Sequence, residues 1–319
     1  MNPLTGLYGA ATAFRNTLYD RGVFSSRRLA RPVISVGNLS VGGSGKTPFV
    51  IAVGELFKAR GISFDVLSRG YRRKTRGVLV VDPDGHAADF GDEPLLIARR
   101  LGVPVVVGES RYQAGQLAEQ KFQSQLHILD DGFQHRSLAR DFDIVLMTDR
   151  DFDDRLLPSG RLREPLSSLQ RADAVVFPRE LSLPEKVANC FTAPEKAVWR
   201  MTRDLTVPQR SASPIVFCGI ARPKQFFAQL RASGITPAAE LPFRDHHAYT
   251  SRDVQALLRA RADKQTTSFL TTEKDAINLG PLLADLAPLT VVALTVTLDN
   301  PAGVIDAILA RIAERKPRS

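Results

Sequence analysis

The chain has little cysteine and no long apolar segment. Its 319 residues include two cysteines, Cys190 and Cys218, which lie in unrelated contexts, so the sequence predicts neither a disulfide framework nor a zinc site. No apolar run approaches the roughly 18 residues that a membrane-spanning helix needs. No positive charge precedes the first apolar positions, as it would in a secretory signal. These absences predict a folded protein in a reducing cytoplasm, with no segment that crosses a membrane.

Nucleic-acid-binding motifs are also missing, although the chain is basic. It has 43 Lys and Arg residues against 34 Asp and Glu residues, a formal net charge of +9. Such a charge predicts attraction to an anionic partner: a nucleic acid, an acidic membrane surface or a phosphorylated small molecule. The sequence contains no recognition helix, zinc finger or aromatic RNA-binding motif. We therefore expect no nucleic-acid partner, and a nucleic-acid-binding ATPase is kept as a rival interpretation.

The first 31 residues combine an apolar stripe with basic residues. The stripe recurs at helical spacing and consists of Leu4, Leu7, Tyr8, Ala11, Phe14 and Leu18. Arginines occupy positions 15, 21, 27, 28 and 31. An amphipathic helix of this kind can lie on an anionic bilayer or pack against its own domain. The residues alone leave both interpretations open.

From residue 32 the chain alternates short apolar runs with helical patterns. The apolar runs include "PVISVGN", "SFDVLS", "VPVVVG", "QLHILD" and "FDIVLM". Continuous apolar strands between helices indicate a parallel sheet covered by helices on both faces. The rhythm breaks near residues 200–213, and "IVFCGI", "TSFLTT" and "LTVVALTV" then indicate a second, smaller α/β unit. The sequence thus predicts an α/β protein with domains at 1–205 and 206–319.

A glycine-rich stretch at residues 35–50, "SVGNLSVGGSGKTPFV", is similar to a phosphate-binding loop. The usual pattern is Gly, four residues and Gly-Lys-Ser/Thr, and here Ser40 stands in the place of the first glycine. Lys46 and Thr47 stand where the cation and the metal-bound hydroxyl are needed. Four small residues could cradle a phosphate at a helix N-terminus: Gly42, Gly43, Ser44 and Gly45. The alternative is a glycine-rich turn with a solvated lysine.

A second motif, "LHILDDGFQH" at residues 126–135, ends an apolar strand in carboxylates. Phosphate-loop sites use an aspartate in this position to bind Mg2+, directly or through water, and Asp130 occupies it. Asp131 and His135 add polar groups to the same turn. An isolated Asp-Asp-Gly is more often a solvated turn, but together with the glycine loop it indicates a nucleotide and metal site.

Candidate catalytic groups lie in "FGDEPLLIARR" and "FRDHHAY". Asp92 and Glu93 precede a predicted helix, where acidic residues commonly cap N–H groups. Phosphoryl transfer to an alcohol also needs a carboxylate to orient or deprotonate the hydroxyl, and Asp92 is the candidate for that role. Two adjacent histidines, His246 and His247, are commonly surface residues, but one of them could contact Asp92 across a domain cleft.

Arginines cluster at the same predicted edge of the sheet. They occur in "SRGYRRKTRG", "GESRYQ" and "PSGRLREP", and include Arg69, Arg72, Arg111, Arg161 and Arg163. Guanidinium groups match phosphate geometry bidentately, so these side chains could bind the nucleotide or an anionic acceptor. For any single arginine, a solvated surface position remains the alternative.

In this order the motifs resemble those of the tetraacyldisaccharide 4'-kinase family, which phosphorylates the lipid A precursor. The resemblance rests on "VGNLSVGGSGKTP", "LSRGYRR", "GDEP", "ESR", "ILDDGFQH", "LPSGRLREP", "DHHAY" and "TTEKDA", and it extends from the N-terminal helix to about residue 278. That family ordinarily carries Ser or Thr where Ser40 stands. The resemblance implies a P-loop kinase-like fold that uses ATP and Mg2+. It also implies transfer of the γ-phosphoryl group to the 4'-hydroxyl of an acylated glucosamine disaccharide 1-phosphate, which forms lipid IVA.

The resemblance further implies roles for particular residues. Lys46 and Thr47 would bind the ATP phosphates and Mg2+, and Asp92 would be the catalytic carboxylate, assisted by His246. A metal and phosphate cluster would consist of Asp130, Asp131, Gln134 and His135, with Arg111 and Arg163 on the phosphates. The amphipathic N-terminus would hold the enzyme at the cytoplasmic face of the inner membrane as a peripheral protein.

A GTP-dependent switch is the nearest competing class. Guanine recognition commonly uses Asn/Thr-Lys-x-Asp after a strand, and "TTEKDA" is close to this pattern. Asp275 follows Lys274 directly, so the spacing is wrong. The kinase interpretation is therefore favoured.

Overall fold

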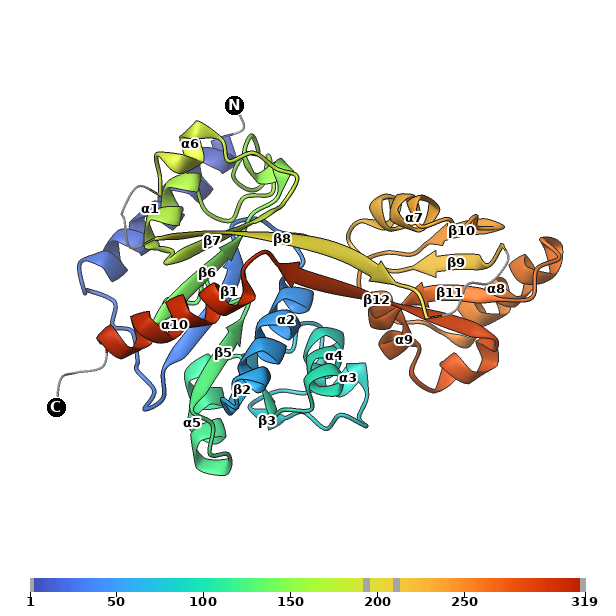
Figure 1. The fold of residues 1–319 in the computed structure, drawn as a ribbon, viewed down its shortest axis with the longest axis horizontal. Coiled ribbons are helices and arrows are strands. Elements are labelled where there is room, and N and C mark those ends of the chain that lie inside the picture. Colours follow the sequence, from blue (N-terminus) through green and yellow to red (C-terminus); the bar gives the residue numbers. More distant parts are fainter. Residues whose placement is uncertain (1–2, 192–195, 209–212, 316–319) are drawn as a thin grey trace.

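One long sheet runs through the whole protein (Figure 1). The computed structural model describes residues 3–191, 196–208 and 213–315. Within these ranges the sheet has 12 strands in the order β10-β9-β11-β12-β8-β7-β6-β1-β5-β2-β4-β3. The strands are β1 (Val33–Asn38), β2 (Phe64–Ser68), β3 (Leu79–Val80), β4 (Val105–Val107), β5 (Leu126–Asp130), β6 (Phe142–Leu146), β7 (Ala174–Pro178), β8 (Ala197–Thr206), β9 (Ile215–Cys218), β10 (Ala239–Pro242), β11 (Phe269–Thr272) and β12 (Leu289–Leu298).

Helices cover both faces of the larger half of this sheet. Successive strand residues belong to opposite cores: Ile128 of β5 packs with the helices at Lys46–Ala59, Asp92–Leu101 and Pro301–Arg315, whereas Leu129 packs with the helix at Arg111–Lys121. The helices are α1 (Pro3–Asp20), α2 (Lys46–Ala59), α3 (Ala87–Phe90), α4 (Asp92–Leu101), α5 (Arg111–Lys121), α6 (Glu185–Ala188), α7 (Pro223–Ala232), α8 (Ser251–Asp263), α9 (Glu273–Leu279) and α10 (Pro301–Arg315). Short 3-10 helices span Asp149–Asp151, Leu166–Arg171 and Gly280–Leu286. The predicted α/β class, with a parallel sheet between helices, is confirmed.

The larger and smaller halves of the sheet meet at an antiparallel pair, β8 and β12, which extends between them in Figure 1. β7 pairs with β8 in parallel, and β11 pairs with β12 in parallel. The sequence analysis did not identify β8. Its segment, "AVWRMTRDLT", mixes apolar and charged side chains, and only Met201 among them is buried. A strand that lies between two halves is partly exposed on both faces, so it lacks the apolar run that marks the other strands.

After the smaller half, the chain returns to the larger one. β12 runs back along β8, and α10 then places Val304, Ile305 and Ile308 in the core that α2 and α4 also fill. Residues 209–212, within the interval where the sequence predicts the domain boundary, lie outside the described residues. The division at residue 205 stays a prediction.

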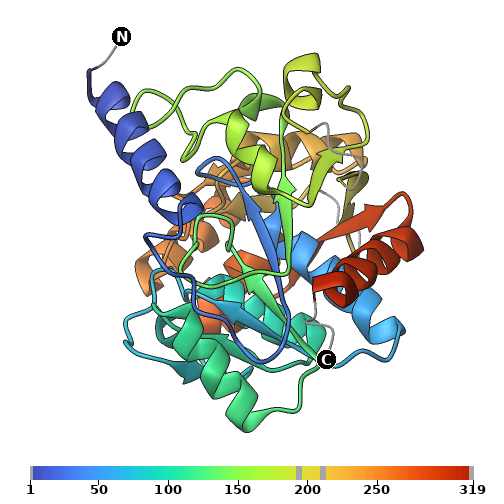
Figure 2. The ribbon, with the colours of Figure 1, turned by 90° about the vertical axis from the view of Figure 1, so that its left-hand side faces the viewer.

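α1 lies along the outer edge of the larger half, at the N-terminal corner of the molecule (Figure 2). Asn16 is the buried residue of this helix, and its Nδ2 donates to Oε2 of Glu164 at 3.0 Å. Among the described residues, none of the helices is long and apolar enough to cross a bilayer.

Candidate active site

The glycine-rich loop connects β1 to α2 at the edge of the sheet where the parallel strands end. Gly42 and Gly45 have φ values of 100° and 84°, a region that favours glycine. Gly45 directly precedes Lys46, the first residue of α2. The loop and the first turn of α2 line a cavity of about 530 Å³. The N–H groups and dipole of a helix N-terminus make such a wall suitable for an anion.

Lys46 and Arg163 converge on Asp131 in the wall of this cavity. Nζ of Lys46 donates to Oδ1 of Asn38 at 3.0 Å and lies 3.4 Å from Oδ1 of Asp131. Nη1 and Nη2 of Arg163 donate to the two carboxylate oxygens of Asp131 at 3.0 and 2.9 Å. Burial opposes the ionisation of Asp131, but Lys46 and Arg163 outweigh it and hold its pKa below the usual range. Two cations and one carboxylate therefore stand beside the phosphate loop.

Asp130, the last residue of β5, has different surroundings from its neighbour. Its Oδ2 accepts a hydrogen bond from Oγ of Ser68 at 3.0 Å. Its Oδ1 and the buried Oγ of Ser44 have no hydrogen-bond partner among the described residues. Burial, followed by the charges of Glu93 and Asp131, raises the pKa of Asp130 to about 7. Two buried oxygens in the cavity wall, Oδ1 of Asp130 and Oγ of Ser44, can therefore still form hydrogen bonds or bind a ligand.

These atoms fit a nucleotide with its metal ion. Mg2+ is commonly bound by one or two carboxylates together with substrate phosphates, and Asp130 and Thr47 line the same cavity. The unbonded Oδ1 of Asp130 and the hydroxyl of Thr47 therefore fit a Mg2+ ion that shares its coordination with phosphates. Within the described ranges, no group of three or more His, Cys, Asp or Glu side chains could hold a metal ion.

Gln134, His135 and Arg111 are not part of the cavity wall. Nε2 of Gln134 donates to the main-chain oxygen of Asn38 at 2.9 Å, and Nε2 of His135 lies 3.1 Å from Oγ of Ser137. Arg111 is buried and donates to two main-chain oxygens of the turn before α5. Burial and the nearby arginines lower the pKa of His135 to about 4. The predicted contacts of these three residues with metal or phosphate stay predictions.

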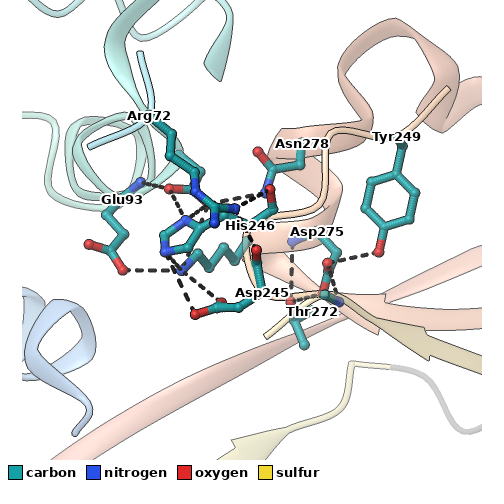
Figure 3. A network of polar contacts seen from close by, with 11 residues as sticks. Arg72, Glu93, Asp245, His246, Tyr249, Thr272, Asp275 and Asn278 are labelled. Carbon is teal, nitrogen blue, oxygen red and sulfur yellow. Dashed lines mark hydrogen bonds and ion pairs between the residues drawn. The ribbon is translucent and has the colours of Figure 1, made fainter. Parts of the chain in front are cut away.

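Asp92 and His246 form a pair that joins the larger half to the smaller one, within the network of Figure 3. Asp92 begins α4, and His246 lies in the loop after β10. Nδ1 of His246 is 2.8 Å from Oδ2 and 3.0 Å from Oδ1 of Asp92, and Nδ2 of Asn278 donates to Oδ2 at 3.1 Å. Burial raises the pKa of Asp92, but the bonds and charges of His246 and Lys274 outweigh it and lower the pKa. Asp92 is thus a buried, ionised carboxylate.

His247 belongs to a different cluster. Its Nε2 is 3.2 Å from Oδ2 of Asp253, and its ring stacks on Phe243 and meets Tyr249 edge-on. Of the two adjacent histidines, His246 is therefore the one that contacts Asp92.

A second cavity, of about 430 Å³, lies beside this pair. Asp92 and Asn278 line it, together with Arg72 and Arg244. His246 lines both this cavity and the one formed by the phosphate loop. The phosphate loop thus lines one cavity and the buried carboxylate of Asp92 lines the other, and the imidazole of His246 belongs to the walls of both.

Two cations of the site were missed by sequence reasoning. Lys274 lies in "TTEKDA", which is close to a guanine-binding pattern, and nothing in the local sequence indicates that its side chain meets His246 and Asp92. Arg203 lies on β8, lines the cavity, and donates from Nη2 to the main-chain oxygen of Ser44. Burial and the charge of Arg222 lower the pKa of Arg203 to about 10. No sequence signal marked Arg203, because its strand was not identified.

Comparisons with known proteins agree with this geometry. A family model described as tetraacyldisaccharide-1-P 4'-kinase matches residues 1–313. The tetraacyldisaccharide 4'-kinase of Koribacter versatilis is 47% identical over 326 residues, covering 99% of each chain. The enzyme of the same name from Aquifex aeolicus is 40% identical over 294 residues, covering 87% of this chain and 88% of the relative. A crystal structure of LpxK from Aquifex aeolicus in complex with ATP has a TM-score of 0.77 at 35% identity, covering 97% and 98% of the two chains.

The fold and the site together define an ATP-dependent kinase of the phosphate-loop class, in which a glycine loop lines one cavity, a buried carboxylate lines a second, and His246 lines both. The match over residues 1–313 identifies the family within that class. The chain belongs to the tetraacyldisaccharide-1-P 4'-kinase family.

Proposed function

We propose that this protein transfers the γ-phosphoryl group of ATP to the 4'-hydroxyl of tetraacyldisaccharide 1-phosphate, the lipid A precursor, and so forms lipid IVA. One observation carries the proposal: His246 lines both the phosphate-loop cavity and the cavity that contains the ionised Asp92. Phosphoryl transfer to an alcohol needs a phosphate cradle and a carboxylate within one site. The family membership supplies the acceptor.

The phosphate side of the site would use residues of the loop and of β5. The main chain of residues 42–45 and Nζ of Lys46 would hold the β- and γ-phosphates. Thr47 and Asp130 would hold Mg2+, which neutralises the charge of the phosphates when it is bound. Arg163, already in the cavity wall, would contact a phosphate oxygen. Asp131 would orient Lys46 and Arg163, because both cations bond to it.

The acceptor side would use the pair formed by Asp92 and His246. Asp92 is ionised, so it can accept the proton of the 4'-hydroxyl as that oxygen attacks the γ-phosphorus. Nδ1 of His246 contacts both oxygens of Asp92 and would orient the carboxylate for this step. Arg72 and Arg244 line the same cavity and would attract an acceptor that carries a phosphate.

The purified full chain tests this proposal with ATP, Mg2+ and the disaccharide 1-phosphate in mixed micelles. We expect ADP release that depends on the acceptor, and none with an acceptor that lacks the 4'-hydroxyl. Lys46→Ala, which removes the cation proposed to hold the phosphates, is the control that should lose this activity. Absence of acceptor-dependent ADP release by the wild type would contradict the assignment. A strong preference for GTP, or stimulation by DNA or RNA instead of the lipid, would favour the rival classes.

We also propose that α1 holds the protein at the cytoplasmic face of the inner membrane. The helix docks to the protein through polar contacts: Tyr8 Oη donates to the main-chain oxygen of Arg163 at 3.0 Å, and Arg15 Nη2 donates to that of Gln134 at 2.7 Å. The same helix exposes Leu4, Leu7 and Phe14 at 58%, 69% and 66%. Exposed apolar side chains on a helix that is followed by Arg21, Arg27, Arg28 and Arg31 are typical of attachment to an anionic bilayer.

Flotation with vesicles tests this second proposal without relying on kinase activity. The variant Leu7→Ser/Phe14→Ser keeps the polar contacts, and Val198→Ser removes an exposed apolar residue of β8 as the matched control. Removing two membrane-facing side chains should lower partition into anionic vesicles by at least about tenfold, since each contributes roughly 1.5–3 kcal/mol when buried. Equal partition of the variant and the control would contradict the proposal.

A further inference from the structure

Lys274 belongs to the network of polar contacts between α4 and α9, in which Figure 3 labels its partners Glu93 and His246. It is the second residue of α9, and its side chain is mostly buried. Nζ donates to Oε1 of Glu93 at 3.1 Å and lies 3.2 Å from Nε2 of His246. The same atom is 3.8 Å from Oδ2 of Asp92 and 3.8 Å from Oδ1 of Asp245. One ammonium group therefore meets three carboxylates and an imidazole.

Lys274 carries its positive charge at neutral pH. Burial lowers its pKa, but the carboxylates of Glu93, Asp92 and Asp245 outweigh that effect and raise the pKa to about 12. An ammonium group has three N–H donors and no acceptor. At 3.2 Å from Nε2 of His246, it can only donate to that nitrogen.

This contact decides which nitrogen of His246 carries the proton. Nε2 must present its lone pair to Lys274, so the ring is neutral and its N–H lies on Nδ1. Nδ1 then donates to the carboxylate of Asp92, at 2.8 Å from Oδ2. Both nitrogens of His246 are thus used, one as acceptor and one as donor.

We propose that Lys274 is a positioning residue, which holds His246 as the neutral Nδ1–H tautomer and thereby orients the carboxylate of Asp92. Without Lys274, Nε2 would lose its donor and would face the carboxylate of Asp245, which lies 3.9 Å away. Nothing at Nε2 would then require a lone pair, so the ring proton would no longer be confined to Nδ1. Lys274 would thus keep the ring in one tautomer.

The surroundings of His246 on every packed element agree with this inference. α4 contributes Asp92 and Glu93, α9 contributes Lys274, and the loop of His246 itself contributes Asp245. The loop after β2 contributes Tyr71, whose ring meets His246 edge-on, and Arg72, whose Nη1 donates to the main-chain oxygen of His246 at 3.1 Å. Arg72 bonds the main chain and leaves the ring nitrogens free, so Lys274 is the cation that contacts the ring.

Asp275 keeps α9 and the His246 loop in one arrangement. This buried carboxylate accepts from the main-chain N of Gly219 at 2.7 Å and from Oη of Tyr249 at 2.8 Å. The main-chain oxygen of Gly219 in turn accepts from the main-chain N of His246 at 3.0 Å. The start of α9 and the backbone of His246 are therefore tied to the same turn. Lys274 meets His246 at a distance that this turn sets.

The tautomer is measurable by nitrogen NMR of the whole chain labelled at its five histidines, with His246 assigned by its loss in His246→Gln. At neutral pH we expect one protonated nitrogen, Nδ1, in the wild type. Lys274→Met should lower the share of the Nδ1–H tautomer, and Lys274→Arg, which keeps a donor beside Nε2, should stay closer to the wild type. Lys264→Met, at an exposed position, is the control and should change nothing. A wild-type ring that is protonated on Nε2, or on both nitrogens, would overturn the inference even if no variant folds.

Kinetics add a second readout, which rests on the proposed function. Misplaced catalytic groups can cost up to about 100-fold, so Lys274→Met should lower kcat by about 10- to 100-fold while KM for ATP stays near that of the wild type. Lys274→Arg should recover part of the loss. Equal loss in both variants, with an unchanged ring in the NMR spectrum, would leave Lys274 with a packing role only. A wild type with the expected tautomer but no acceptor-dependent turnover would refute the proposed function and not the tautomer.

Discussion

Among the described residues, two Asp–His pairs have a buried carboxylate, and they differ in what contacts the second nitrogen of the imidazole. In the first pair, Nδ1 of His246 is 2.8 Å from Asp92, and Nε2 faces Lys274 at 3.2 Å. In the second, Nδ1 of His127 is 2.7 Å from Asp65, and Nε2 faces Glu119 at 3.4 Å. A cation beside the ring favours a neutral histidine, whereas a second carboxylate favours an imidazolium.

The two pairs also differ in their place in the fold. Asp65 and His127 are register partners on the parallel strands β2 and β5, and both are fully buried in the sheet. Asp92 and His246 come from a helix and a loop in different halves of the molecule, and His246 lines both cavities. The first pair therefore lies at the two cavities, where we propose that it serves the reaction, and the second lies within the sheet. The following substitutions separate the two roles.

Asp92→Ala should have the largest effect on turnover. Loss of a positioned acid–base group typically costs about 10²- to 10⁴-fold, and the phosphate loop does not include Asp92, so ATP binding should be retained. Single-turnover kinetics and equilibrium ATP titration measure the two quantities. Near-normal turnover would return Asp92 to a helix-capping role.

Asp65→Ala should act on stability and leave the chemistry alone. It removes one partner of a buried ion pair, which costs roughly 3–5 kcal/mol of unfolding free energy. Urea unfolding measures the loss, and kcat per active site should stay near the wild-type value. A large fall in kcat with unchanged stability would mean that the two pairs are not functionally distinct.

The charge of His127 predicts the direction in which pH changes stability. Burial lowers its pKa, but Asp65 and Glu119 outweigh that effect and raise the pKa above the ordinary value. The charged His127 therefore contributes its full share of the free energy of unfolding below about pH 6.5, and this share is lost as the pH rises through the folded-state pKa. The loss is about 1.4 kcal/mol for each pH unit by which the folded-state pKa exceeds the ordinary value. His127→Gln should flatten this decline in urea unfolding between pH 6 and 9. The exposed His86→Gln should preserve it, and identical slopes in all three proteins would contradict the assignment.

His247→Gln should have the smallest effect. Its ring packs on Phe243 and bonds to Asp253, 3.2 Å away, and it has no contact with Asp92. Substitutions outside the site generally change free energies by about 0.5 kcal/mol, so kcat should stay within about threefold of the wild type. A loss as large as that of His246→Gln would show that both imidazoles serve the reaction.

The sequence predicts the parts of this structure whose signals are local. The phosphate loop is one continuous stretch between an apolar strand and a helix, so the amino-acid sequence is sufficient to predict its place at the end of β1. The position of Asp130 at the end of β5 follows in the same way. Pairing between Asp92 and His246 could be proposed only as one of two alternatives, because 153 residues of chain separate the two positions.

The missed features depend on contacts between distant segments. β8 is stabilised by β7 and β12 and not by an apolar run of its own, so neither the strand nor Arg203 on it could be identified. Lys274 gains its importance from Glu93 and His246, which reach it from two other elements. Asp65 and His127 each lie within apolar runs, and only the register of β2 and β5 makes them neighbours.

The return of α10 has a consequence for any attempt to divide the chain. The larger half is not one continuous segment, because Val304, Ile305, Ile308 and Ile312 fill its core after the chain has passed through the smaller half. A fragment that stops at residue 205 would expose the apolar surface of α2 and β6 that these side chains cover. In topological terms the smaller half is an insertion within the larger one. A linker that bridges β8 directly to β12 is therefore the connection that could yield an independently folding nucleotide-binding half.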